Sequence, residues 1–177
     1  AAARMGRLTT AEGLYRKALE QDPGDAGLAA ELGLVLVGMN RAPEARPYLE
    51  HARVADPGND RVLGGLGLVC LAEGRVEEAM DLLRNALDAD LDSEALLDPF
   101  LRAAEELGRL PAARAVIERY AEFYPGNLDL ACRYAAVLAA LGECGKARER
   151  LESLLEFAPG HAEALRLLSQ LQQDGTP

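Results

Sequence analysis

The chain has few of the side chains that bind metals or form cross-links. Its 177 residues include two histidines, three cysteines and no tryptophan. The cysteines (Cys70, Cys132 and Cys144) are odd in number and far apart, and no Cys-x-x-Cys pair occurs. His51 and His161 also lack a familiar metal-ligand spacing to them. We therefore expect neither a disulfide framework nor a zinc site, and we predict a protein without metal or cofactor.

Long apolar runs and positive charge are also scarce. No run of about 18 apolar residues occurs, so no segment is predicted to insert into a membrane. Lys and Arg number 19 against 29 Asp and Glu, which gives a net charge of −10. Because nucleic-acid binding depends on neutralising phosphates, this balance argues against a nucleic-acid partner. No secretory signal is visible, so the compartment stays unknown, with the cytoplasm as the default.

No pattern typical of an active site is present. The sequence predicts no strand, so it offers no phosphate-binding loop between a strand and a helix. Gly64-Gly65 lies inside a helical pattern, where glycine permits a close helix approach. Cys70 falls in a column of large apolar residues and is expected in the core. We expect His51 to be exposed and His161 to lie in a turn, and we predict no catalytic residues and no enzyme activity.

One period runs through nearly the whole chain. Alanines recur every 34 residues, at Ala11, Ala45, Ala79, Ala113 and Ala147. Two further columns keep the same spacing: Pro23, Pro57, Leu91, Pro125 and Pro159, and Gly6, Asn40, Gly74, Gly108 and Gly142. A fixed period of this length predicts a repeat array, in which each unit packs on its neighbours.

Each period divides into two helical stretches. In residues 60–93, Leu63, Leu66 and Cys70 recur at helical spacing before Gly74, and a second helical pattern begins near Ala79. Glycine suits the end of the first helix because it adopts a left-handed conformation without a Cβ clash. The alanine column places a methyl group where two helices cross closely, since a larger side chain would force them apart.

These columns resemble the tetratricopeptide repeat. That family has Leu-Gly on the first helix of each unit, Ala and a large apolar residue four places on in the second helix, and a closing Pro. The matching residues are Leu32-Gly33, Leu36, Ala45, Leu49 and Pro57; Leu63, Leu66-Gly67, Cys70, Ala79 and Leu83; and Tyr134-Ala135, Leu138, Ala147, Leu151 and Pro159. The resemblance covers roughly residues 1–173 and implies an all-α solenoid, a right-handed superhelix of stacked antiparallel helix pairs.

The third full unit departs from the family pattern. It has Phe100-Leu101 where Leu-Gly is expected, and it follows Leu91 in place of Pro. The family's Trp is absent throughout, and its positions hold Ala29, Leu63, Leu97 and Ala131. We expect an irregular first helix in this unit. Pro99 either kinks a helix that begins near Ser93, or occupies the first position of a shorter helix capped by Asp98.

The expected organisation is four full units between two partial ends. The full units are 26–59, 60–93, 94–127 and 128–161; residues 1–25 are a partial first unit, mainly its second helix; 162–173 are a capping helix; and 174–177 are a disordered tail. Ala1 is not an initiator methionine, and Leu8, Leu14 and Leu19 have no preceding helix to pack on. We therefore expect a fragment of a longer protein, or an N-terminal end that another molecule covers.

The resemblance also implies where a partner binds. In that family the first helices of the units line a concave groove that holds ligand peptides. The corresponding candidate residues are Glu31, Leu34, Val37, Arg61, Leu68, Leu71, Arg102 and Arg133. Leu34 and Leu68 either contact an apolar face of a partner or pack against their own neighbouring helices. Arg102 and Arg133 either bind a carboxylate or belong to a solvated or internally paired face.

The leading interpretation is a non-catalytic scaffold that binds a peptide or helix of a partner protein in this groove. One alternative is an assembly protein that forms homo-oligomers through its uncapped N-terminal end. Another is the interaction arm of a longer multidomain enzyme or of a secretion or biogenesis component. Sedimentation separates the first alternative from the leading interpretation, and the full-length gene separates the second.

Overall fold

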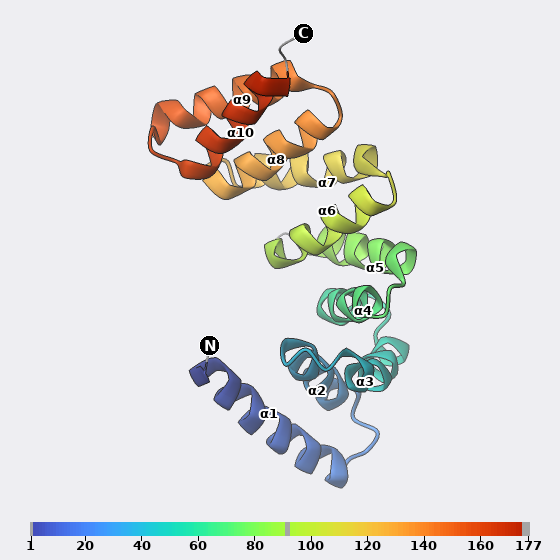
Figure 1. The fold of residues 1–177 in the computed structure, drawn as a ribbon. Coiled ribbons are helices and arrows are strands. Elements are labelled where there is room, and N and C mark those ends of the chain that lie inside the picture. Colours follow the sequence, from blue (N-terminus) through green and yellow to red (C-terminus); the bar gives the residue numbers. More distant parts are fainter. Residues whose placement is uncertain (1, 91–92, 175–177) are drawn as a thin grey trace. The chain divides into compact units, whose positions relative to one another are not determined.

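Helices make up all the regular structure that is described. The computed structural model describes residues 2–90 and 93–174, and within them ten α-helices, one short 3-10 helix and no strand are found (Figure 1). The α-helices are α1 (Ala2–Gln21), α2 (Ala26–Gly38), α3 (Ala42–Ala55), α4 (Asp60–Ala72), α5 (Val76–Ala89), α6 (Leu97–Glu106), α7 (Leu110–Phe123), α8 (Leu128–Ala140), α9 (Cys144–Phe157) and α10 (Ala162–Asp174). The predicted all-α fold is confirmed, and none of the described helices is long and apolar enough to cross a membrane.

The chain divides into two compact units, Ala1–Leu107 and Gly108–Pro177, called unit 1 and unit 2 below. Within unit 1, α2 packs on α3, α4 on α5, and α3 on α4, while α1 packs on α2. Within unit 2, α8 packs on α7 and α9, and α10 packs on α9 and α8. In each unit most helices thus contact the helices next to them in sequence, as the helices of a solenoid do.

The turns inside the helix pairs use the predicted left-handed residues. Asn40, Gly74, Gly108 and Gly142 have φ angles of 61°, 75°, 65° and 80°. This conformation lets the last turn of a first helix close before the second helix begins. Gly6, which shares their column, lies inside α1 and is therefore not a turn residue.

Side-chain caps begin the first helix of most pairs. Asp25, Asn59 and Asn127 each accept a hydrogen bond from the backbone N–H three residues on, at 2.9, 3.1 and 3.1 Å. Such a cap satisfies an N–H group that has no partner within its helix. At α10 the cap is His161, whose Nδ1 accepts from the N–H of Ala164 at 3.3 Å.

The small residues of the repeat let the paired helices approach closely. The alanine column is fully buried at Ala45, Ala79, Ala113 and Ala147. A Cβ added to Gly33 would lie 2.6 Å from Cγ of Leu49, and one added to Gly67 would lie 2.7 Å from Cγ of Leu83. These leucines occupy the space that a side chain on the facing helix would need, so the Leu-Gly positions are determined by packing.

The chain is irregular at the start of α6. A 3-10 helix, Glu94–Leu96, precedes α6, and α6 is shorter than the other first helices. Pro99 lies in the first turn of α6, where its missing N–H costs no hydrogen bond. The helix begins at Leu97, so the expectation that Asp98 caps it was wrong. Residue Leu91, whose column lacks proline here, lies outside the described residues.

The two ends of the chain differ from the expected partial units in detail. α1 is one continuous helix of 20 residues. A Cβ added to Gly38 of α2 would lie 3.6 Å from Cδ1 of Leu8, so Leu8 packs on α2. Leu19 packs against the core of unit 1, whereas Leu14 is exposed. Two of the three leucines therefore pack on the helices that follow them. α10 extends to Asp174, and the remainder of the predicted tail, residues 175–177, lies outside the described residues.

Candidate functional site

The predicted apolar contact residues lie on α2 and α4 of unit 1. Leu34, Val37, Leu68 and Leu71 are all half-buried. Leu34, Val37 and Leu71 pack against the buried core of unit 1, and Cδ2 of Leu34 lies 2.9 Å from the place of a Cβ at Gly65. Leu68 is not among the described side chains that pack against this core. Leu34 therefore helps to hold α2 against α4. No such contact is described for Leu68, and part of its side chain is exposed to solvent.

The acidic and basic candidates on the same two helices bind each other. Nη1 of Arg61 donates to Oε1 of Glu31 at 2.7 Å, and Nη2 donates to Oε2 at 3.2 Å. This hydrogen-bonded carboxylate raises the pKa of Arg61 above its usual value. A two-point contact between planar groups fixes both side chains, so this pair links α2 to α4 beside the leucines.

The two remaining candidates lie in different units. Arg102 is exposed on α6 of unit 1 and makes no ion pair with any residue that the structure describes. Arg133 is half-buried on α8 of unit 2 and already interacts within the protein. Seven of the eight candidates thus belong to unit 1, where Leu34 and Glu31 of α2 contact Gly65 and Arg61 of α4.

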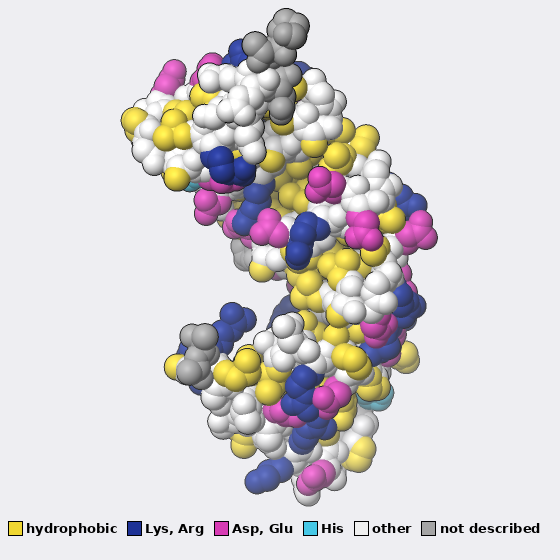
Figure 2. Space-filling model, viewed as in Figure 1, with side chains coloured by type: hydrophobic (Ala, Val, Ile, Leu, Met, Phe, Trp, Pro, Cys, Tyr) yellow, Lys and Arg dark blue, Asp and Glu magenta, His cyan; other side chains and the backbone are white. Residues whose placement is uncertain are grey.

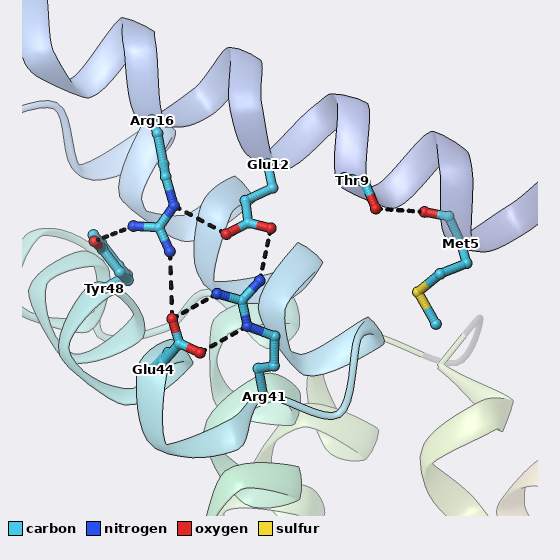
Figure 3. Close-up of polar contacts among 7 residues, drawn as sticks. All are labelled: Met5, Thr9, Glu12, Arg16, Arg41, Glu44 and Tyr48. Carbon is cyan, nitrogen blue, oxygen red and sulfur yellow. Dashed lines mark hydrogen bonds and ion pairs between the residues drawn. The ribbon is translucent and has the colours of Figure 1, made fainter.

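Charged side chains anchor α1 to α3, a feature that the sequence analysis missed. Glu12 accepts from Nε of Arg16 at 3.0 Å and from Nη1 of Arg41 at 2.7 Å, and Arg41 also pairs with Glu44 at 2.7 Å (Figure 3). Arg16 further donates to the hydroxyl of Tyr48 at 3.2 Å. The two arginines, Arg16 first, lower the pKa of Glu12. The contacts of Glu12 with Arg41 and of Arg16 with Tyr48 join residues 29 and 32 positions apart, too far for helical periodicity to indicate them.

Exposed apolar side chains on α1 do not form one patch. Met5 and Leu14 are 49% and 63% exposed. They are nine residues apart, which places them on opposite sides of an α-helix. On the face seen in Figure 2, charged side chains are prominent over α1 and its neighbours, and hydrophobic ones gather over α4. The region of α4 is therefore the more apolar of the two.

Unit 2 contains a hollow that the sequence analysis did not predict. It has a volume of about 840 Å³ and lies among α7, α8 and α9. The guanidinium of Arg150 stands 4.3 Å above the ring of Tyr134, whose hydroxyl donates to Glu118 at 2.6 Å. Burial, and then the bond to this carboxylate, raise the pKa of Tyr134. One residue in the sequence could have indicated this hollow. Arg150 occupies a position that, at 34-residue intervals, otherwise holds Leu14, Tyr48, Leu82 and Val116.

Cys70, His51 and His161 lie where the sequence analysis expected them. Cys70 is buried in the core, where burial raises the pKa of its thiol despite a contact with Arg46 at 3.4 Å. His51 is exposed, and His161 precedes α10. Among the described residues, no group of three His, Cys, Asp or Glu side chains is arranged to hold a metal ion.

Paired helices with a 34-residue period, close Leu-Gly contacts and left-handed turns define a helical-repeat scaffold. A family model described as tetratricopeptide repeat matches residues 2–53, 36–98 and 104–171. The chain therefore belongs to the tetratricopeptide repeat family, whose members are protein-interaction scaffolds. Proteins of this family are generally non-catalytic.

Solved structures support the same fold. YrrB, described as a TPR protein with an unusual peptide-binding site, is 22% identical; the match covers 89% of this chain and 81% of YrrB with a TM-score of 0.73. A tetratricopeptide repeat protein from Parabacteroides merdae is 16% identical over 96% of this chain and 67% of its own, with a TM-score of 0.74. The pilF protein of Pseudomonas aeruginosa is 20% identical over 98% and 88%, with a TM-score of 0.69. A comparison with curated proteins gave no match.

Proposed function

We propose that the protein binds a peptide or helix of a partner protein along α2 and α4 of unit 1. The observation that supports this function is the half-buried side chain of Leu68, which lies on a first helix and is not among the described side chains packed against the apolar cluster of α2 to α5. Leu34, Val37 and Leu71 extend the apolar surface on the same two helices, although they also pack inward. Apolar residues at helical spacing on a partner would bury this surface.

The charge of unit 1 favours a basic partner. Unit 1 carries 11 Lys and Arg against 20 Asp and Glu, whereas unit 2 carries 8 against 9. A partner helix with leucines on one face and lysines or arginines beside them would complement both the apolar strip and the acidic surroundings. Charge complementarity of this kind raises the association rate and suppresses wrong partners.

The substitution Leu68→Glu tests this function. The probe is a library of capped amphipathic peptides in which either lysine or glutamate flanks an apolar face. We expect lysine-flanked members to bind and Leu68→Glu to weaken them about tenfold or more, because a buried charge replaces an apolar contact. The helical circular dichroism signal should be retained. Leu34→Glu is a poorer test, since Leu34 holds α2 against α4 and its loss should also lower stability.

Val54→Glu provides the matched control. Val54 is an 83% exposed apolar residue on the second helix α3, so the same charge is added outside the proposed surface. Equal weakening by both variants, or no effect of Leu68→Glu, would contradict the proposal.

Sedimentation of the purified protein without peptide tests self-association through α1. The separation of Met5 and Leu14 around the helix gives that alternative little support. An interaction arm of a longer protein would make the same prediction for Leu68.

A further inference from the structure

At two positions of the repeat, the α8–α9 pair has a different type of residue from the two repeats before it. The position of Ala131 is held in the two preceding repeats by Leu63 and Leu97, which are 9% and 0% exposed. The position of Arg150 is held by Leu82 and Val116, which are 7% and 4% exposed. Ala131 is half-buried and Arg150 is exposed. A small residue and a solvated one thus replace two apolar residues that fill the interior in the two preceding repeats; the first full repeat has Ala29 and Tyr48 at these positions.

The hollow of unit 2 lies at these two residues. Ala131 and Arg150 both line it. Its apolar lining consists of Leu128, Ala131, Leu138, Leu154 and Phe157. Phe157 is 84% exposed, and the matching positions at the ends of α5 and α7 are Ala89 and the 58% exposed Phe123. About 840 Å³ is within the range of sites that hold a large side chain or a small ligand, and the exposed ring of Phe157 offers further apolar contact at its edge.

Three cationic side chains line the hollow, and they differ in how far they are already neutralised. Arg114 pairs with Glu143 at 2.5 Å, and Lys146 pairs with the same carboxylate at 2.7 Å. Arg150 makes no ion pair with any residue that the structure describes, and its guanidinium rests on the Tyr134 ring. This stacking leaves the edge of the guanidinium, which carries its N–H donors, available for a carboxylate. Glu118 and Glu149 also line the hollow, and both would repel an anionic ligand, although Glu118 accepts the hydrogen bond of Tyr134.

We propose that this hollow binds an acidic segment of a partner protein. A large apolar side chain of the segment occupies the space above Ala131, and a neighbouring carboxylate binds Arg150. The site is separate from the proposed surface of α2 and α4, and it selects a ligand of opposite charge. The bidentate match between guanidinium and carboxylate gives orientation, and the apolar space gives most of the buried area.

The experiment uses the whole chain, labelled with ¹⁵N, and two pools of capped hexapeptides with randomised outer positions. One pool has Phe-Glu at its centre and the other has Phe-Lys. We expect the Phe-Glu pool to shift amide resonances of α8 and α9, and the Phe-Lys pool to bind about tenfold more weakly or not at all. A third pool with Ala-Glu at the centre should also bind at least about tenfold more weakly, because it leaves the space above Ala131 unfilled.

Four variants distinguish this site from general charge attraction. Arg150→Gln and Ala131→Leu should each weaken the Phe-Glu pool about tenfold, the first by removing the cation and the second by filling the space. Arg148→Gln is the matched control, since Arg148 is exposed on the same helix but does not line the hollow. It should leave binding unchanged, and Glu149→Gln should strengthen it.

Three results would overturn the proposal. Equal binding of the Phe-Glu and Phe-Lys pools would remove the role of Arg150. An equal loss of Phe-Glu binding in Arg148→Gln and Arg150→Gln would show that binding depends only on the net charge of the protein. If the α8 and α9 resonances shift with protein concentration when no peptide is present, the hollow binds a second copy of the chain.

Discussion

The two units use one repeat period but fill it differently. In unit 1, Gly33 and Gly67 let leucines of the facing helix fill the space between paired helices, and Leu63 and Leu82 complete the interior. In unit 2, Ala131 and Arg150 stand at the positions of Leu63 and Leu82, and a hollow results. The period therefore determines where helices begin and end, while single residues in its columns determine which surface each helix pair offers.

The largest contrast between the units should appear when one aromatic side chain is removed from each. Phe100→Ala should lower the free energy of unfolding by about 3–5 kcal/mol, because Phe100 is fully buried on α6. Phe157→Ala should change it by no more than about 0.5 kcal/mol, because the ring of Phe157 is mostly exposed. Urea unfolding followed by circular dichroism measures both. A comparable loss in Phe157→Ala would show that the edge of the hollow has a structural role.

A smaller difference is expected for added side chains at glycine. Gly67→Val should cost about 1–3 kcal/mol, since its Cβ would lie 2.7 Å from Cγ of the buried Leu83. In unit 2, a Cβ at Gly145 meets no atom within 4 Å. Gly145→Ala should therefore be neutral or stabilise by up to about 1 kcal/mol. Thermal unfolding of the two variants provides the comparison, and an unchanged midpoint for Gly67→Val would contradict the close packing of α4 on α5.

Acidification should loosen α1 more than α10. The pKa of Glu12 is lowered from its ordinary 4.5 by arginines, one of which, Arg41, lies outside α1. A carboxyl whose pKa is lowered on folding contributes stability above its unfolded pKa and loses it as pH falls through the folded value. The pKa of Glu163 is also lowered, but its hydrogen-bonded partner, Arg166, is in the same helix.

Hydrogen exchange of α1 and α10 amides at about pH 6 and about pH 3, corrected for intrinsic rates, checks this contrast. The loss of α1 protection should be reduced in Arg41→Gln, which already lacks the cross-helix pair. Glu20→Gln, an exposed substitution on α1, should behave as the unaltered protein. Equal loss of protection in α1 and α10 would show that the Glu12 contacts do not anchor α1.

The smallest effect concerns thiol chemistry and leaves stability unchanged. Cys144 is exposed at the start of α9, whereas Cys70 and Cys132 are buried and burial raises the pKa of both thiols. Since the thiolate is the reactive form, a maleimide should label Cys144 first, and the other two only on unfolding. Mass spectrometry of labelled peptides measures the order. Rapid labelling of Cys70 in the folded protein would show that α4 opens locally.

The fold was predictable because its determinants repeat. Each left-handed turn, buried alanine and Leu-Gly contact lies in a column that the sequence displays without any knowledge of contacts. The irregular start of α6 was also indicated by Pro99, although Asp98 does not cap it. The caps formed by Asn59 and Asn127 are also local, because each bonds a backbone N–H only three residues further along the chain.

The sites were less predictable because they depend on contacts between helices. The two-point pair of Arg61 with Glu31 and the network around Glu12 join residues about thirty positions apart. Periodicity places such residues on a helix face but does not select their partners. The hollow depends on where the Arg150 side chain lies, over Tyr134 and outside the interior. Arg150 interrupts an apolar column and Ala131 follows two leucines in its own column, and these two changes are the signs of the hollow in the sequence.

The left-handed turns at Asn40, Gly74, Gly108 and Gly142 make the junctions of this chain interchangeable. Each of these residues ends the first helix of a repeat with a similar φ angle, so the first helix of one repeat can be joined to the second helix of another with little change at this turn. A chimera that is to inherit the hollow must take residues 114–157 and not the single repeat 128–161, because Arg114, Glu118, Pro125 and Gly126 also line it.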